Sequence, residues 1–397
     1  MSVDLRTRTD ADVPVVEAER FFGVDLPELA ERRADLVALA VGHLDLRPLA
    51  VEVDGRSWRL EPDGDGIRTA PGTADATLSV TAQRMADLVN DHVTPVGLMT
   101  AGEWTLDRHL RTVMDWWLVL RSLIDERPVH VPGAVTVAAD VTRSFTLDDD
   151  PAELRGFLEE AGFLHLRGVF TATEMQRISD DMDIAEPTRS PGDGRSWWAT
   201  TADGTERVVR MQRFNEDSPT AAALLDDDRF LAIGAIPGVG YDHPRIGRSN
   251  PIEALFKPIG VRQGISDVPW HKDCSLGRHS YECCSLTVGI SVTGAGPGSG
   301  QLRVIAGSHR ALVWPSLFDA AALDLPEVPL ATETGDVTAH LSCTLHMAEP
   351  PTERERRVMY TGFSLAPPDR ESAMRQRVRM RATRESAPLT TSQPPAG

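Results

Sequence analysis

The tripeptide His271-Lys272-Asp273 contains residue types that could bind a transition metal. Imidazole and carboxylate groups bind ferrous iron in oxygenases that use two histidines and one carboxylate, an arrangement that leaves three coordination positions open. If the tripeptide lies on a strand, its first and third side chains point to the same side, because strand side chains alternate. The spacing therefore suits two ligands of one metal ion.

A second tripeptide of the same form, His43-Leu44-Asp45, shows that the pattern can also arise by chance. It falls at the end of a segment with helical apolar spacing. Nothing near it in the sequence supplies a third ligand. We expect these side chains to lie on the surface, in contact with solvent.

A third ligand would come from a later strand, where four histidines are candidates: His279, His309, His340 and His346. The first two lie in GRHS and AGSHR, which are rich in turn residues. The last two lie in TGDVTAHLSCTLHMAEP, which is typical of a strand, and they share its parity. Both could therefore face inward, and His346 is preferred because of the arginine that follows it.

Arg357 follows His346 at the distance of a hairpin, with the loop EPPTERE between them. An arginine beside a metal can bind a dicarboxylate through two parallel, charge-assisted hydrogen bonds. Arg356 is the rival, and on a regular strand it points to the other side, toward solvent. A surface salt bridge is the alternative role for Arg357, and a structural role is the alternative for each histidine.

Only two of the 41 basic residues are lysines, Lys257 and Lys272, and both lie near the tripeptide. Codon bias could explain the arginines elsewhere. The two lysines are then either an accident or the sign of a site that requires a compact ammonium rather than a planar guanidinium. The sequence leaves both explanations open.

The elements that position these residues fall into two predicted units. Residues 20–128 combine helical segments, such as TAQRMADLVND and RHLRTVMDWWLVLRSLI, with short strands in LAVEV, RSWRLE and ATLSVT. Thr81 is predicted to cap the first of these two helices. Residues 129–140, which contain proline, are the predicted linker.

The second unit covers residues 141–380. It opens with a helix and a strand in ELRGFLEEAGFLHLRGVF and continues with a capped helix in TATEMQRISDDMDIA. From about residue 250, short strand-like runs alternate with Gly/Pro turns. The predicted fold class is α+β with two domains, and the polar, Pro-rich tail at 381–397 is predicted to be disordered.

Composition excludes several classes of protein. The apolar content of 41% and charged content of 25% are typical of a soluble globular protein. The net charge of −18 disfavours nucleic acids and anionic membrane surfaces, which attract basic proteins. The sequence has no transmembrane run and no apolar signal-peptide core, so we expect a cytoplasmic protein. Four cysteines are too few for a disulfide scaffold.

From about residue 140 to 370 the chain resembles the phytanoyl-CoA dioxygenase family of Fe(II)/2-oxoglutarate oxygenases. PWHKD looks like the metal pair of that family, GSGQLRVIAGSHR like its next strand and turn, and GDVTAHLSCTLH like its distal ligand segment. The resemblance implies a double-stranded β-helix, a jelly-roll or cupin-like barrel with flanking helices. It implies iron ligands at His271, Asp273 and His346, and a 2-oxoglutarate carboxylate bound by Arg357.

Lys257 occupies the strand before the metal pair, where the resemblance implies a contact with the cosubstrate or the substrate. Residues 20–128 are similar to the sterol carrier protein family in ADATLSVTAQRMADLV and TPVGLMTAGEWTLDRHL. That similarity implies a small α/β layer around an apolar tunnel. Two roles stay open for this unit: a carrier of a lipid or hydrophobic substrate, or a docking or dimerisation domain with a closed core.

The predicted function is an oxygenase that uses Fe(II), 2-oxoglutarate and O2 to hydroxylate, or otherwise oxidise, an unactivated C–H bond of a small hydrophobic molecule. One alternative is a non-catalytic lipid-binding carrier with a vestigial β-helix. Another is a cupin-like metal enzyme that does not use 2-oxoglutarate. The sequence leaves a homodimer open.

Overall fold

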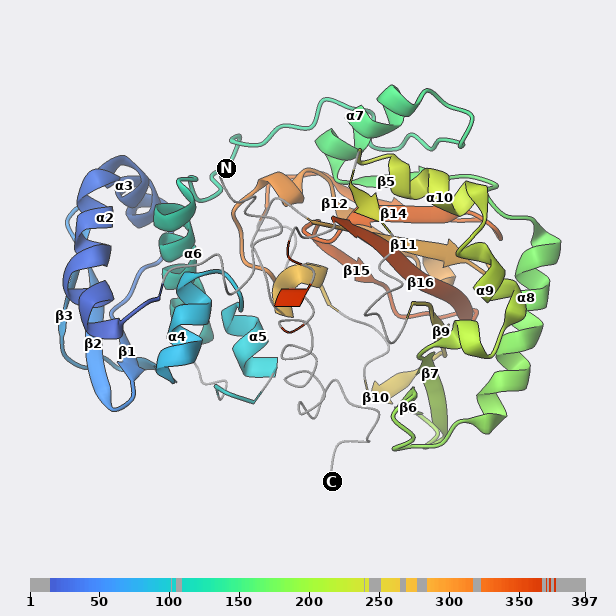
Figure 1. Ribbon diagram of the computed structural model, residues 1–397, viewed down its shortest axis with the longest axis horizontal. Helices are drawn as coiled ribbons and strands as arrows, with labels where there is room; N and C mark the ends of the chain where they lie inside the picture. Colours follow the sequence, from blue (N-terminus) through green and yellow to red (C-terminus); the bar gives the residue numbers. More distant parts are fainter. Residues whose placement is uncertain are drawn as a thin grey trace.

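The structure is a computed structural model, which describes residues 15–100, 102–104, 109–238, 240–242, 251–264, 269–276, 284–316, 323–365, 369, 371–372 and 375. The predicted tail at 381–397 and the candidate His279 lie outside the described residues. Figure 1 shows the N-terminal elements gathered on one side of the molecule and the large sheet on the other. Within the described ranges, every helix is too short or too polar to cross a membrane.

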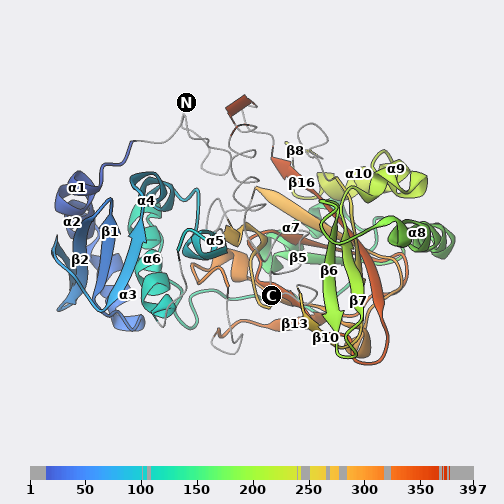
Figure 2. The same ribbon diagram turned by 90° about the horizontal axis from the view of Figure 1, so that it is seen from below.

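The N-terminal elements form a sheet covered by helices (Figure 2). The sheet has the order β3-β2-β1-β4, in which β1 pairs antiparallel with β2 and parallel with β4. The elements are α1 (Ala18–Arg20), η2 (Phe21–Asp25), α2 (Leu26–Arg32), α3 (Ala34–His43), β1 (Leu49–Val53), β2 (Arg56–Asp63), β3 (Gly66–Pro71), β4 (Ala76–Val80), α4 (Ala82–Val89), α5 (Pro95–Thr100) and α6 (Leu110–Asp125).

Local chemistry explains where several of these helices begin and end. The Thr81 hydroxyl accepts a hydrogen bond from the backbone N–H of Arg84, so the predicted cap of α4 is confirmed. The helically spaced segment that ends at His43 forms two helices, α2 and α3, because Arg33 leaves the helical region with φ −125° and ψ 44°.

The remaining elements are α7 (Pro151–Ala161), β5 (Phe163–Leu166), α8 (Ala172–Ala185), η3 (Glu186–Thr188), β6 (Ser196–Thr201), β7 (Glu206–Met211), η4 (Phe214–Glu216), α9 (Pro219–Leu224), α10 (Asp228–Ala235), β8 (Tyr241–Asp242), β9 (Glu253–Lys257), β10 (Val261–Gln263), η5 (Asp273–Leu276), β11 (Ser285–Ser291), η6 (Pro297–Ser299), β12 (Leu302–Ile305), η7 (Ser308–Arg310), β13 (Glu327–Leu330), β14 (Val337–Leu341), β15 (His346–Ala348) and β16 (Arg356–Leu365). The predicted cap of α8 is confirmed, since Thr171 and Glu174 form a reciprocal capping box.

A large antiparallel sheet runs through this part of the chain in the order β10-β6-β7-β9-β16-β11-β14-β5. Helices α8, α9 and α10 lie along one face of it (Figures 1 and 2). The packing is close: a Cβ added at Gly234 on α10 would lie 2.3 Å from the Phe363 ring on β16. We call this helix-covered side the outer face and the opposite side the inner face.

A smaller antiparallel sheet has the order β13-β12-β15. The mixture of helices with a large antiparallel sheet agrees with the predicted α+β class and with a cupin-like fold. The predicted strand TGDVTAHLSCTLHM is divided between the sheets, because β14 belongs to the large one and β15 to the small one.

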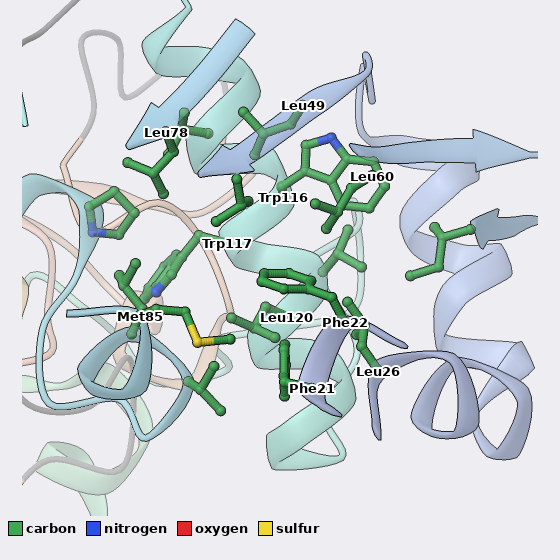
Figure 3. Close-up of a pocket in the computed structure, with 17 residues that line it drawn as sticks. Phe21, Phe22, Leu26, Leu49, Leu60, Leu78, Met85, Trp116, Trp117 and Leu120 are labelled. Carbon is green, nitrogen blue, oxygen red and sulfur yellow. The ribbon is translucent and has the colours of Figure 1, made fainter. Parts of the chain in front are cut away.

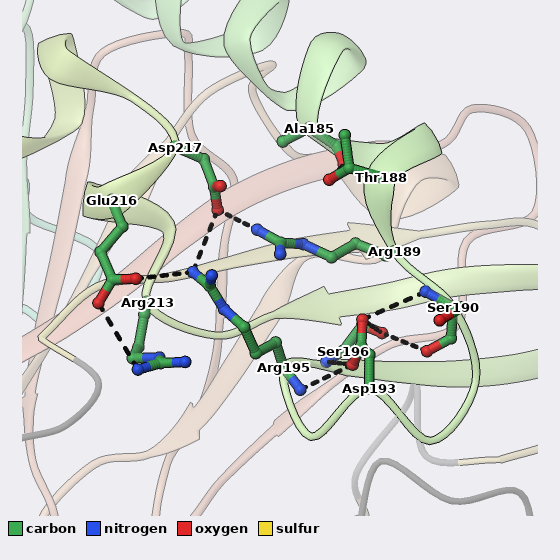
Figure 4. Close-up of polar contacts among 10 residues, drawn as sticks. All are labelled: Ala185, Thr188, Arg189, Ser190, Asp193, Arg195, Ser196, Arg213, Glu216 and Asp217. Atoms are coloured by element: carbon green, nitrogen blue, oxygen red, sulfur yellow. Dashed lines mark hydrogen bonds and ion pairs between the residues drawn. The ribbon is translucent and has the colours of Figure 1, made fainter.

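Ion pairs join the segment just before the β6–β7 hairpin to the neighbouring η4 turn (Figure 4). Arg195 lies 3.0 Å from Glu216 and 3.7 Å from Asp217, which also pairs with Arg189. The Asp193 carboxylate accepts hydrogen bonds from the loop just before β6. These contacts set where the hairpin begins.

Among the residues that the structure describes, the buried apolar side chains form two large clusters and a small one. One large cluster belongs to the N-terminal elements (Figure 3) but also includes Leu312 from the later part of the chain. Val129 forms a bridge with Leu312, and the Trp314 indole N–H donates to Asp115 of α6 over 3.1 Å. The N-terminal elements are therefore packed directly on the segment at 312–314.

The Asp115 carboxyl predicts a pH-dependent stability. Burial raises its pKa to about 6, although Arg111 opposes this rise. In the unfolded chain the group ionises near pH 4, so the folded state is progressively destabilised as the pH rises from about 4 to about 6. Asp115→Asn cannot ionise and should be more stable than the native protein above pH 6, by about 3 kcal/mol.

Denaturant unfolding at pH 4, 5, 6 and 7.5 measures this difference. Asp35→Asn, an exposed change on α3, is the control and should show no such trend. A constant difference between Asp115→Asn and native protein across the series would contradict the assignment.

Candidate metal centre

His271 and His346 lie directly opposite each other on adjacent extended segments. Each donates its backbone N–H to the other's carbonyl over 3.0 Å. These two bonds add the segment around His271 to the small sheet, next to β15. Residues paired in this way project their side chains to the same side. The backbone pairing therefore brings two imidazoles together, with ring centroids 4.3 Å apart.

Asp273 completes the group from the first residue of η5. Its Oδ1 lies 3.7 Å from His271 Nε2 and 3.4 Å from His346 Nε2. One ligand atom from each of the three residues lies within 4.8 Å of the others. Ligands about 2.1 Å from a common metal would be roughly 3 to 3.5 Å apart, so only a small adjustment is required.

Hydrogen bonds outside the group turn each ligand toward the centre. His271 Nδ1 lies 2.7 Å from the Pro269 carbonyl, and His346 Nδ1 lies 3.0 Å from the Thr344 carbonyl. A carbonyl can only accept, so both Nδ1 atoms carry the proton and both Nε2 atoms present a lone pair. Thr287 of β11 donates to Asp273 Oδ2 over 2.6 Å, which leaves Oδ1 for the metal.

The protonation states also suit a metal. Burial would raise the pKa of the Asp273 carboxyl, but the surrounding His346, His271 and His340 hold that pKa well below its usual range. Burial lowers the pKa of His271, and repulsion from His346 adds to this effect. An ionised carboxylate and a neutral imidazole are the forms that bind a divalent cation.

His340 of β14 lies next to the three candidate ligands. Its ring is tilted by 47° against that of His346, with centroids 4.2 Å apart, and its Nε2 lies 3.4 Å from Asp273 Oδ2. Its Nδ1 has no hydrogen-bond partner in the described part of the chain. Both downstream histidines thus face the centre, but not through shared parity on one strand, because the strand on which that expectation depended is divided between β14 and β15.

Lys272, between the two ligands, points the other way and is fully buried. Its ammonium lies 3.3 Å from the Ser308 carbonyl and 3.4 Å from the Ala311 carbonyl. A compact ammonium suits this enclosed space and links the metal segment to the turn after β12. Of the two explanations offered for this lysine, the structure favours a specific role.

His309 and His43, the other histidines considered above that the structure describes, have a structural and a surface position. His309 lies on η7, where its Nε2 is 2.9 Å from the Glu159 carbonyl, and burial lowers its pKa to about 4. His43 is exposed at the end of α3, and Asp45 pairs with Arg47 at the surface. The second His-x-Asp tripeptide is therefore a surface feature, as expected.

Arg357 does not face the centre, so this part of the prediction was wrong. Its guanidinium lies on the outer face, where it donates to the Ser179 carbonyl over 2.9 Å and pairs with Asp183 at 2.5 Å. Both partners belong to α8. The expected orientation was inverted because the alternation of a strand tells which residues share a face, but not which of the two faces turns inward.

Arg356 lies on the inner face and is only 4% exposed. It donates to the Gly300 carbonyl, and its second terminal nitrogen lies 3.4 Å from the Tyr360 hydroxyl. The guanidinium thus extends along β16 toward Tyr360. In the sheet register Tyr360 is opposite Gly289, two residues from Thr287 and therefore in the direction of Asp273.

Lys257 of β9 is the direct cross-strand partner of Arg356 and is 2% exposed. Two buried cationic side chains therefore lie next to each other on the inner face. Tyr360 packs closely over Gly289, because a Cβ there would lie 2.9 Å from Thr338 Oγ1 and 3.0 Å from the Tyr360 ring. The inner face of the large sheet thus carries Thr287 and His340 beside the metal-binding group, and a cationic pair on β9 and β16.

The sequence of the part of the chain that contains the large sheet matches a known family. Residues 158–358, about half of the 397-residue chain, match the profile described as phytanoyl-CoA dioxygenase (PhyH). The chain belongs to the phytanoyl-CoA dioxygenase family. No curated protein sequence matches the chain.

Several crystal structures are similar to this member of the phytanoyl-CoA dioxygenase family. EvdMO1 has 20% sequence identity and a TM-score of 0.42, with 54% of this chain and 50% of that chain covered. The epimerase SnoN, in complex with Fe3+, alpha-ketoglutarate and nogalamycin RO, has 18% identity and a TM-score of 0.41, covering 54% and 84%. EctD from S. alaskensis, with 2-oxoglutarate and 5-hydroxyectoine, has 18% identity and a TM-score of 0.43, covering 58% and 82%.

The bond from Thr287 to Asp273 predicts a measurable effect on metal binding. Thr287→Val removes the donor that orients the carboxylate, and changes of this kind typically weaken metal affinity by about 10- to 100-fold. Anaerobic titration with Fe(II), or with Co(II) followed by its absorption bands, measures the affinity. Thr338→Val on neighbouring β14 is the control, and equal affinities in the two variants would refute the role of Thr287.

Proposed function

We propose that this protein is an Fe(II)/2-oxoglutarate-dependent oxygenase that oxidises a C–H bond of a small hydrophobic molecule. The observation that carries the proposal is the convergence of one atom each from His271, Asp273 and His346, with both imidazole Nε2 atoms turned inward. Two histidines and one carboxylate that leave other positions open are the donor set of such iron sites. A cytoplasmic location, expected from the sequence, remains part of this proposal.

Arg356, rather than Arg357, is proposed to bind the far carboxylate of 2-oxoglutarate. It is buried on the inner face, and its guanidinium extends in the direction of Asp273. A planar guanidinium can bind a carboxylate through two hydrogen bonds at once. Lys257, directly across the strand pair, would add a second positive charge for the same carboxylate.

The residues of the chain supply position and environment for the chemistry. When bound, Fe(II) with 2-oxoglutarate and O2 supplies the oxidising power for an unactivated C–H bond. His271 and His346 are held by backbone pairing and by their Nδ1 bonds, so they require little reorganisation to act as ligands. Burial of Arg356 and Lys257 excludes water, which strengthens their attraction for a dianionic cosubstrate.

Replacement of a metal ligand tests the proposal directly. His346→Ala should abolish 2-oxoglutarate decay to succinate and should also lose Fe(II) binding, because one of three ligands is removed. The native protein should instead show a visible charge-transfer band when Fe(II) and 2-oxoglutarate are added without oxygen. A native protein that binds no iron under these conditions would favour the alternative, a non-catalytic lipid-binding carrier.

Arg356 and Arg357 are adjacent residues of the same type, so their alanine variants form a matched pair for testing the cosubstrate site. Arg356→Ala should raise the KM for 2-oxoglutarate by about 100-fold or more, since a buried charged hydrogen-bond partner is lost. Arg357→Ala removes only the contact with α8 and should change this KM less than about threefold. The opposite ranking would show that Arg357 is the cosubstrate residue, and no effect of either would favour a metal enzyme that does not use 2-oxoglutarate.

A further inference from the structure

Two cysteines face each other beside the metal centre. Cys274 lies on η5 and Cys343 lies in the turn between β14 and β15, 69 residues farther along the chain, and their sulfur atoms are 3.4 Å apart. A disulfide has an S–S bond of about 2.05 Å, so the two sulfurs would need to approach each other by only about 1.4 Å. Neither thiol has a part in the metal or cosubstrate binding proposed above.

Backbone hydrogen bonds hold the two cysteines at this distance. The Cys274 N–H donates to the Ser342 carbonyl over 3.3 Å, which joins η5 to the residue just before Cys343. Ser342 donates its own N–H to the carbonyl of the first residue of β11 over 3.0 Å, and the Thr344 hydroxyl donates to the Gly162 carbonyl over 2.8 Å. The turn is therefore anchored on both sides of Cys343, and any approach of the sulfurs falls mainly to Cys274.

The two thiols differ in their accessibility. Cys343 is 0% exposed, whereas Cys274 is only partly buried. A small oxidant from solvent therefore reaches Cys274 first. Redox-sensitive cysteines are typically accessible and lie next to a second cysteine that reacts with the first oxidation product. The arrangement matches these two roles, with Cys274 attacking the oxidant and Cys343 completing the disulfide.

We propose that a peroxide oxidises Cys274 and Cys343 to a reversible disulfide, and that this modification weakens metal binding. The Cys274 sulfur attacks one oxygen of hydrogen peroxide, the O–O bond breaks, and a first water leaves with the thiol proton, which gives a sulfenic acid. The Cys343 sulfur then attacks the Cys274 sulfur, the S–S bond forms, the S–O bond breaks, and the hydroxyl leaves with the second thiol proton as water. The two thiols are oxidised, and one peroxide is reduced to two waters.

The disulfide would act on the metal centre through Asp273, the residue directly before Cys274. Its Oδ1 lies 3.7 Å from His271 Nε2 and 3.4 Å from His346 Nε2. Movement of Cys274 toward Cys343 carries the Asp273 backbone with it and draws the carboxylate away from its place between the imidazoles. We expect metal affinity to fall by at least about 10-fold, the size of effect that follows when the support of a ligand is lost. This consequence rests on the proposed function, whereas the disulfide itself does not.

Peptide mapping of the full-length, metal-free protein tests the disulfide. Treatment with hydrogen peroxide followed by alkylation should yield linked peptides that contain Cys274 and Cys343, and dithiothreitol should restore both thiols. In Cys343→Ala, the same treatment should leave Cys274 as a sulfenic acid that dimedone traps. Cys284→Ser is the matched control, because it changes another partly buried cysteine and should still give the linked peptides. Unmodified thiols, or a linked pair that includes Cys283 or Cys284, would overturn the proposal.

Anaerobic titration with Co(II) tests the effect on the metal centre. Oxidised native protein should bind Co(II) at least about 10-fold more weakly than the same protein after reduction and removal of the reductant. Cys274→Ser, which cannot form the disulfide, should bind Co(II) equally well before and after peroxide treatment. Equal affinities of oxidised and reduced native protein would overturn the effect on the metal. Reduced protein that binds no Co(II) would overturn the proposed function as well, whereas the linked peptides would still establish the disulfide.

Discussion

The backbone pairing of His271 with His346 is the constraint on which the metal centre depends. Two hydrogen bonds of 3.0 Å place these residues opposite each other, so their imidazoles must project to the same side. Asp273 is held between the two sheets, because Thr287 of the large sheet donates to its carboxylate. The two histidines are therefore positioned by backbone hydrogen bonds of the sheet type, whereas Asp273 lies on η5 and is held by a side-chain bond.

The large sheet separates two kinds of surface through the alternation of its strands. Its outer face packs on α8, α9 and α10, where Arg357 is used for a structural contact with α8. Its inner face holds Thr287, His340 and the buried Arg356. Because neighbouring residues on β16 point to opposite sides, the adjacent arginines have different roles despite identical chemistry.

Much of the local structure could be predicted because short-range chemistry determines it. Thr81 and Thr171 cap the helices that follow them, and the helical and strand-like segments fall near their predicted positions. Predictions that depended on the register of a strand were less accurate. The segment from Gly335 to Met347 was expected to be one strand but is divided between two sheets, and Arg356 and Arg357 exchanged their expected faces.

By itself, the sequence determined the family, the α+β class and the short set of residues able to bind a metal, since ligand chemistry and spacing can be read directly from it. Only the tertiary structure decided which downstream histidines approach Asp273, that Thr287 holds its carboxylate, and that Cys274 faces Cys343. These features depend on contacts between residues distant in the chain. A shift of one residue in strand register would turn Thr287 and His340 to the opposite face of the large sheet, although the local sequence pattern would stay the same.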